Sequence, residues 1–174
     1  MNVRPAEAAE IDQLARIWFE GWQDAHGRIV PAGLARLRTL DNFRERLQAA
    51  LPGVRGAGPF REPVGFYLLK GDELDQLYIS AQARGSGVAA ALIADAEAWL
   101  AREGVEIAWL ACAIGNERAA RFYEKSGWRR AGNVVYQAET SNGTFPLEVW
   151  RYEKRLSPPR SEPSRCRLVA IDWL

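Results

Sequence analysis

The sequence contains few of the residues on which several protein classes depend. Only two cysteines, Cys112 and Cys166, occur in 174 residues, too few for a disulfide framework or a cysteine-based zinc site. No apolar run approaches the ~18 residues that a membrane-spanning helix needs, and residues 1–5 lack the apolar core of a signal peptide. A formal net charge of +1 provides no basic field for nucleic acid or an anionic membrane. We therefore expect a cytoplasmic protein that binds no nucleic acid, no membrane and no metal.

The remaining composition is typical of one globular domain followed by a tail. Hydrophobic residues make up 48% and charged residues 26% of the chain, which is ordinary for a folded domain of this length. A Pro/Ser-rich stretch at 157–164 precedes a short apolar segment at 166–174. We predict a domain over residues 1–156, then a linker and tail over 157–174. The tail is expected to pack on the body or on a second copy, and a homodimer is favoured because two-fold dimers are common.

Hydrophobic spacing in the first half of the chain predicts helices and then a strand pair. Residues 8–25 carry apolar side chains at helical spacing, and a second helical stretch follows Pro31. The Gly- and Pro-rich segment 52–59 is predicted to be a loop. Two strands at 64–69 and 74–80 are predicted to form a hairpin.

The second half predicts a helix at 87–103, a covered strand at 105–114 and a helix that Asn116 begins. Strands at 133–139 and 146–156 flank a strong hairpin signal, Ser-Asn-Gly-Thr. The elements together predict a mixed, mostly antiparallel α/β sheet of six to seven strands with about four helices.

A glycine-rich turn, Arg84-Gly85-Ser86-Gly87-Val88-Ala89, joins the strand at 74–80 to the following helix. Such a turn lets the backbone approach an anion at a helix N-terminus. Alone, it also fits a plain strand-to-helix connection, or the dinucleotide pattern G-x-G-x-x-A with Glu106 about 20 residues on. A hairpin, rather than a parallel βαβ unit, precedes the turn, which disfavours an NAD(P)-binding enzyme.

Two linked motifs resemble those of the GNAT superfamily of acyl-CoA-dependent N-acetyltransferases. Arg84-x-x-Gly87-x-Ala89 is similar to the family's acyl-CoA motif R/Q-x-x-G-x-G/A. Residues 116–128 resemble its second motif, N-x-x-A-x-x-F-Y-x-x-x-G-F/W. The motifs follow the family's order, and the resemblance covers about residues 1–156. It implies a GNAT-like twisted sheet with a splayed central parallel pair, and direct transfer of acetyl from acetyl-CoA to a primary amine.

The resemblance also implies roles for single residues around the cosubstrate. The backbone of Leu77, Tyr78 and Ile79 would bind the pantetheine arm like an added strand. The amides from Arg84 to Ala89 would hold the pyrophosphate, with the Arg84 side chain either neutralising charge or solvated. Asn116 would lie near the pantetheine, cap its helix, or do both. Tyr123 would lie near the CoA sulfur as a proton donor, or would only pack.

The general base stays open in the sequence. The strand at 109–113 lacks the glutamate that several family members carry there. The remaining candidates are Asp75, Glu73 and His26; Glu73 is expected to be exposed at its turn, whereas His26 has a suitable ordinary pKa. Cys112 has no obvious activating histidine and lies in an apolar run that would raise its pKa, so direct transfer is preferred to an acyl-enzyme.

The acceptor site is expected to contain Trp22, His26 and Tyr136. Trp18 and Phe19 are expected in the core, with Trp22 the most open member of this aromatic stripe. No acidic or basic cluster identifies the acceptor, which stays open between a small molecule and a protein amino group. Because no convincing base is found, a non-catalytic acyl-CoA-binding sensor remains an alternative.

Overall fold

Seven strands form one sheet with the order β1-β2-β3-β4-β5-β7-β6 in a computed structural model that describes residues 2–156. The strands are β1 (Val3–Pro5), β2 (Val54–Ala57), β3 (Gly65–Lys70), β4 (Glu73–Ile79), β5 (Ile107–Ala113), β6 (Arg129–Thr140) and β7 (Gly143–Arg155). The α-helices are α1 (Ile11–His26), α2 (Ala32–Leu37), α3 (Leu40–Ala50), α4 (Val88–Arg102) and α5 (Glu117–Lys125). Short 3-10 turns are η1 (Ala8–Glu10), η2 (Leu51–Gly53) and η3 (Ala81–Ala83).

Only the β4–β5 pair of this sheet is parallel. The predicted mixed, mostly antiparallel fold is therefore confirmed, with five α-helices in place of about four. The predicted linker and tail at 157–174, and the homodimer expected through them, lie outside the described residues. Within residues 2–156, no helix has the length and apolar character that a bilayer crossing would require.

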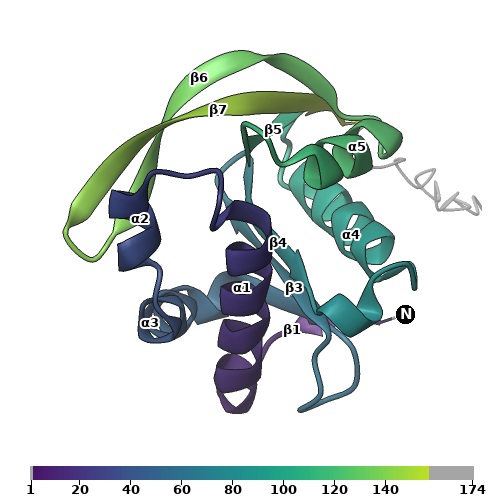
Figure 1. Cartoon of the computed structure of the whole chain (residues 1–174). Helices are drawn as coiled ribbons and strands as arrows, with labels where there is room; N and C mark the ends of the chain where they lie inside the picture. The colour runs from purple at the N-terminus through teal and green to yellow at the C-terminus, as the bar shows by residue number, and fades with distance from the viewer. Residues whose placement is uncertain (1, 157–174) are drawn as a thin grey trace, which may run out of the picture.

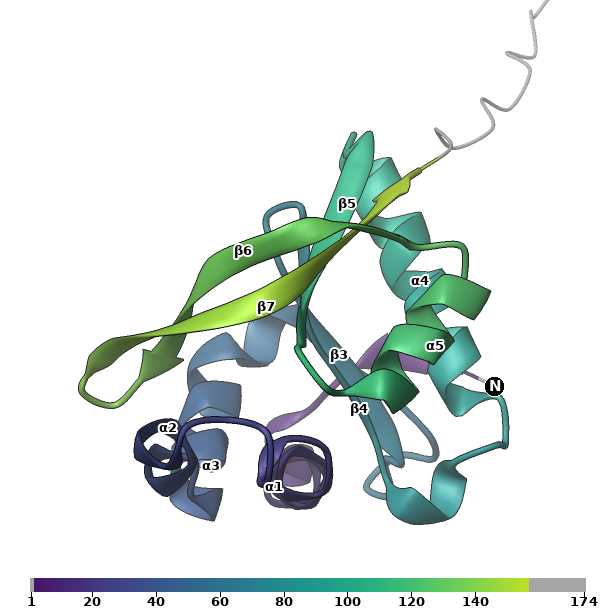
Figure 2. The same cartoon turned by 45° about the horizontal axis from the view of Figure 1, so that its top comes forward.

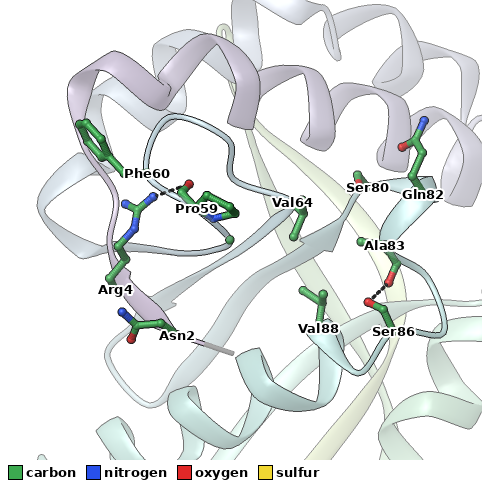
Figure 3. A pocket seen from close by; sticks show the side chains of 11 residues that line it. Asn2, Arg4, Pro59, Phe60, Val64, Ser80, Gln82, Ala83, Ser86 and Val88 are labelled. Atoms are coloured by element: carbon green, nitrogen blue, oxygen red, sulfur yellow. Dashed lines mark hydrogen bonds between the residues drawn. The ribbon is translucent and has the colours of Figure 1, made fainter.

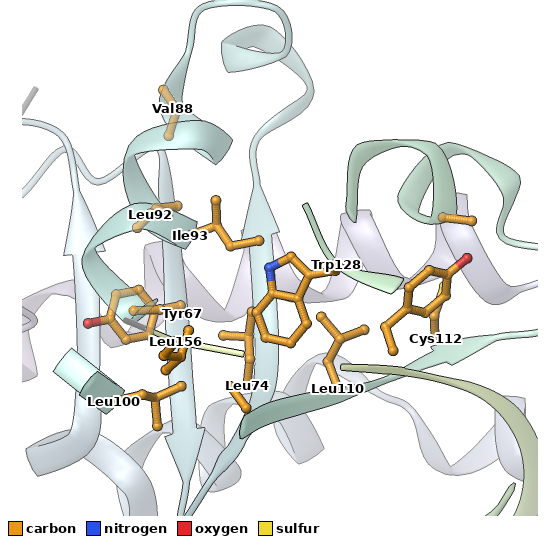
Figure 4. Close-up of a cluster of buried hydrophobic side chains, with 14 of the residues drawn as sticks. Tyr67, Leu74, Val88, Leu92, Ile93, Leu100, Leu110, Cys112, Trp128 and Leu156 are labelled. Carbon is orange, nitrogen blue, oxygen red and sulfur yellow. The ribbon is translucent and has the colours of Figure 1, made fainter. Parts of the chain in front are cut away.

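Helices cover both faces of the sheet and enclose two hydrophobic cores (Figure 1). Helices α4 and α5 lie on one face, where Leu92 and Leu100 of α4 pack with Leu110 of β5 and with Trp128 (Figure 4). Helices α1 and α3 lie on the other face, where the Trp18 ring lies 4.7 Å from that of Phe43. Each helix thus buries its apolar stripe against the pleated surface, as its period predicts.

Strands β4 and β5 separate soon after they meet. Glu73 and Trp109 form the single register pair between them. Opposite Leu68 and Leu69 the register shifts so that Asp75 is an extra residue in β4, a β-bulge, which bends a strand and disrupts its pairing. The facing edges of the two strands beyond Glu73 are left without register partners, and the strands diverge (Figure 2). The splayed parallel pair implied by the resemblance is therefore present.

The prediction of a loop over 52–59 is wrong, because 54–57 form β2. This short strand pairs with both β1 and β3, so partners distant in sequence satisfy its backbone despite the nearby glycines and proline. The helical stretch after Pro31 is divided in two. The division occurs at Thr39, whose side chain accepts a 3.1 Å hydrogen bond from the Asn42 amide and begins α3.

Candidate active site

A cavity of about 390 Å³ lies where β4 and β5 separate. Its walls come from α1, the α2–α3 region, β4, β5, the starts of α4 and α5, and the β6–β7 hairpin. The residues predicted from sequence that line it are Trp22, His26, Asp75, Leu77, Tyr78, Ile79, Arg84, Gly85, Ala89, Asn116, Tyr123 and Tyr136. Four further predicted residues, Glu73, Ser86, Gly87 and Val88, are not among its lining residues. One space thus brings together candidates for both cosubstrates.

At one end of the cavity, the glycine-rich turn leaves backbone donors open. Gly85 and Gly87 have φ values of +76° and +86°, and a Cβ on either would meet nothing within 4 Å. Gly87 is the N-cap of α4 and supplies no side-chain cap. In residues 2–156, no hydrogen bond engages the amides of Gly85, Gly87, Val88 or Ala89. Unpaired N–H groups at a helix N-terminus fit an anionic group such as a phosphate.

A second, larger hollow borders the same turn at Ser86 and Val88 (Figure 3). Its volume is about 780 Å³, and both Ser86 and Val88 line it. Two of its polar side chains are bonded within the protein: the Ser86 hydroxyl donates to the Ala83 carbonyl at 2.6 Å, and Arg4 donates to the Pro59 carbonyl at 3.0 Å. The hollow lacks a group of titratable side chains suited to proton transfer. The cavity between β4 and β5 is therefore the better candidate site.

Arg84 is neither a free cation nor merely solvated. It donates to Asp24 of α1 at 2.8 Å, and Arg118 of α5 donates to the same carboxylate oxygen at 2.7 Å. Bonds from Arg118 and Arg84 hold the pKa of Asp24 below its usual range. One acidic residue thus connects α1 to both motif regions, and both arginines line the cavity.

Near the middle of the cavity lie the residues expected at the reacting sulfur. Burial raises the pKa of Tyr123 above its usual range, so its phenol stays protonated at neutral pH. Asn116 caps α5, its side chain accepting from the Ala119 amide at 3.2 Å, and it also lines the cavity. Burial raises the pKa of the Cys112 thiol to about 12, which removes the thiolate that an acyl-enzyme would need.

Two carboxyl groups of β4 converge on Tyr136 of β6. The Tyr136 hydroxyl donates to Asp75 at 3.0 Å. The prediction that Glu73 is exposed is wrong, because Glu73 is only 6% exposed. Burial first, and then the charge of Asp75, raise the pKa of Glu73 to about 7. Tyr136 lies some sixty residues later in the chain and donates to Asp75, two residues from Glu73, so the local turn could not reveal the environment of Glu73.

The remaining acceptor-side candidates are more buried than expected. Trp22 is 7% exposed, so the prediction that it is the open member of its stripe is wrong; Phe19 is instead partly exposed. The centre of the Trp22 ring lies 5.4 Å from that of the His26 ring. Burial lowers the pKa of His26 to about 4, which leaves a neutral imidazole and a weak base at pH 7.

Sequence reasoning missed two arginines in the acceptor half of the cavity. Arg38, at the end of α2, and Arg46, on α3, both line it. The Arg46 guanidinium lies 4.4 Å from the centre of the Trp18 ring. The expectation that no basic cluster occurs here is wrong, because helical arginines are usually solvated and only the packing of α2 and α3 turns these two inward. Residues 2–156 bring no three His, Cys, Asp or Glu side chains together as metal ligands.

Comparison with known proteins agrees with this geometry. The acetyltransferase (GNAT) family model matches residues 12–128. A GCN5-related N-acetyltransferase from Rhodopseudomonas palustris is 21% identical with a TM-score of 0.69, covering 89% of this chain and 95% of its own. YjaB from Escherichia coli is 25% identical with a TM-score of 0.64, covering 87% and 95%.

The PaiA N-acetyltransferase from Thermoplasma acidophilum, solved with coenzyme A, is 18% identical with a TM-score of 0.60, covering 88% and 98%. A search of curated protein sequences gave no match. The family model, the splayed β4–β5 pair and the open α4 N-terminus agree with one another. This chain belongs to the GNAT acetyltransferase family.

Proposed function

We propose that this protein transfers an acetyl group from acetyl-CoA directly to a primary amine. The observation that carries the proposal is that one cavity is lined by the glycine-rich turn before α4, by Tyr123 and by Asp75, with the buried Glu73 two residues from Asp75 on the same strand. Open backbone donors, a proton donor and a proton acceptor are the three elements that such a transfer needs. The coenzyme A bound to the Thermoplasma acidophilum relative supports the choice of cosubstrate.

The residues present fit an acyl-CoA on their own chemistry. The open amides of Gly85, Gly87, Val88 and Ala89 would hold the pyrophosphate, whereas those of Arg84 and Ser86 already donate to Ala81 and Ala83. The side chains of Arg84 and Arg118 would add positive charge beside it. The backbone of Leu77 to Ile79, whose edge faces the gap between the strands, would bond the pantetheine amides like an added strand. Asn116 keeps its amide nitrogen free for the same arm while its oxygen caps α5.

The two carboxyl groups of β4, Asp75 and Glu73, would orient the amine and accept its proton. Attack of the amine nitrogen on the thioester carbonyl forms the C–N bond, breaks the C–S bond and requires the amine to lose a proton. Asp75 lines the cavity and would orient the amine. Glu73, with a pKa of about 7, is suited to accept the proton at neutral pH, directly or through a water molecule. The Tyr123 hydroxyl would donate a hydrogen bond to the CoA thiolate as it departs.

The proposal is tested by calorimetric titration with acetyl-CoA, CoA and NADH, followed by a thiol-release assay with a panel of amines. We expect binding of the first two ligands only, and thiol release that depends on an amine. Failure to bind acetyl-CoA would overturn the proposal. Binding without thiol release for any amine would indicate the non-catalytic sensor instead.

A further inference from the structure

Arg38 is a buried cation that forms no ion pair with any carboxylate among residues 2–156. Its side chain belongs to a residue only 6% exposed, and its Nε has no hydrogen-bond partner. Its one hydrogen bond in residues 2–156 runs from Nη1 to the Asn42 side-chain oxygen at 3.4 Å, longer than a normal bond of this kind. An unpaired buried charge is costly, and strongly perturbed charges in a cavity are typical of functional sites.

The surroundings of Arg38 leave its charge unneutralised. Burial, and then the like charge of Arg46, lower the pKa of Arg38 to about 10, so it remains a cation at neutral pH. Asp75 acts on it from a distance, but no ion pair joins the two. The Asp75 carboxylate instead accepts the Tyr136 hydroxyl.

Arg46 has no carboxylate partner either within the described part of the chain. It stacks on Trp18, and the nearby Glu139 is bonded by Lys70. Two arginines therefore line one cavity, and within residues 2–156 no carboxylate forms an ion pair with either of them. Glu139 acts on both only from a distance, and Asp75 lines the same cavity. This arrangement separates a site for an anion from a site for an amine.

We propose that the acceptor is a small amine that carries a carboxylate, such as an amino acid, and that Arg38 with Arg46 binds this carboxylate while the amine faces Asp75. The inference rests on the proposed function and names its substrate class. A guanidinium matches a carboxylate in shape and charge. The cavity of about 390 Å³ also has to accept the end of the pantetheine arm, which favours a small acceptor.

The test compares amino acids with their carboxamides, which keep the amine and lose the negative charge. For the wild-type protein we expect kcat/KM to be about 10- to 100-fold higher for the acids, as one charged hydrogen-bonding partner warrants. Arg38→Met should lower kcat/KM for the amino acids to the value for their carboxamides. It should leave kcat/KM for the carboxamides unchanged. Arg44→Met is the matched control, because Arg44 is on α3 but bonds Asp12 and Asp41 away from the cavity.

A binding measurement separates recognition from catalysis. Added amino acid should raise the Tm of the wild-type protein and not that of Arg38→Met. If Arg38→Met does not fold, Arg38→Lys replaces it in the test. Arg38→Lys should still prefer amino acids to their carboxamides, but with a lower kcat/KM, since lysine keeps the positive charge and lacks the planar guanidinium. Equal kcat/KM for acids and amides in the wild type would overturn the inference while leaving acetyl transfer intact. Absence of transfer to every amine would instead refute the proposed function.

Discussion

Two charged side chains, Glu10 and Arg38, are buried to a similar extent but differ in how fully they are hydrogen-bonded. Glu10 is 1% exposed and Arg38 is 6% exposed. The Glu10 carboxylate accepts hydrogen bonds from Nη1 and Nη2 of Arg4 and from the backbone amides of Glu7 and Arg61. Arg38 makes one long hydrogen bond, to Asn42. Bonds from Arg4 hold the pKa of Glu10 at about 2, which favours its charge, whereas burial lowers the pKa of Arg38, which disfavours its charge.

The difference indicates which buried charges serve the fold and which serve the site. Glu10 connects β1, the start of α1 and the loop before β3, and every contact is internal to the protein. Burial disfavours the charged forms of Arg38 and Glu73, and both residues lie beside a cavity. A bound ligand could neutralise Arg38 there, and a proton could neutralise Glu73. Charged groups with strongly shifted pKa values in a cavity are typical of functional sites, whereas buried charges with all their hydrogen bonds made inside the protein are typical of structural roles.

Glu73→Gln is expected to have the largest effect. It removes the proton acceptor, so kcat should fall by roughly 10²- to 10⁴-fold. Because burial raises the pKa of Glu73 to about 7, wild-type kcat should rise with pH through this value, and the variant should lose that dependence. The measurement is a pH–kcat profile of both proteins. An identical profile would assign the base to Asp75 or to water.

The same variant should change the pH dependence of stability. The folded pKa of Glu73, about 7, lies above its ordinary value of 4.5. The wild-type protein should therefore be relatively stabilised below pH 4.5 and lose this contribution as pH rises to 7. Glu73→Gln should be the more stable protein at pH 8, which thermal unfolding at pH 5 and pH 8 would show. A variant less stable at both would place Glu73 with Glu10 as a structural charge.

Glu10→Gln should act on stability alone. Loss of one partner of a buried pair should cost about 2 to 4 kcal/mol at pH 7, since Arg4 keeps some solvent exposure. The pKa of Glu10 is lowered to about 2, so its contribution is present above pH 4.5 and is lost as pH falls towards 2. Urea unfolding at pH 7 and pH 3 measures both effects, with the exposed Glu45→Gln as control. A large fall in kcat of the folded variant would contradict the comparison.

Tyr123→Phe removes only a hydroxyl and should act on chemistry more than on binding. The ring keeps its neighbours Phe122 and Tyr152, so the fold should persist. We expect kcat to fall by roughly 10- to 10³-fold because the departing thiolate loses its donor. The acetyl-CoA dissociation constant should change far less. Unchanged kcat, with chemistry rate-limiting, would show that Tyr123 only packs.

Gly87→Ala should have a smaller effect, a loss of acetyl-CoA affinity of about tenfold, because a Cβ enters the space proposed for the pyrophosphate. Gly104→Ala is the matched control. Gly104 lies just beyond the other end of α4 with φ +83°, and its added Cβ would also meet nothing within 4 Å. Equal affinities of the two variants, measured by calorimetry, would mean that backbone strain alone explains the loss. Ser86→Ala should leave affinity unchanged.

The sequence by itself determined the elements whose signals are local. Asn116 was predicted to begin a helix, and its side chain does cap α5. The turn at Gly85 and Gly87, the helix after it and the final hairpin follow from capping, positive φ and short periods, which a few adjacent residues specify. The motif order at Arg84 and Tyr123 then indicated the family.

Only the tertiary structure decided the environment of each charge. Asp24 binds arginines 60 and 94 residues away, β2 forms because β1 and β3 lie beside it, and Tyr136 reaches back to Asp75 over 61 residues. Neither the burial of Glu73 nor that of Arg38 can be recognised from the residues next to it in the sequence. Burial and pairing depend on which distant segments pack together, because desolvation and Coulomb energy follow distance in space and not separation along the chain.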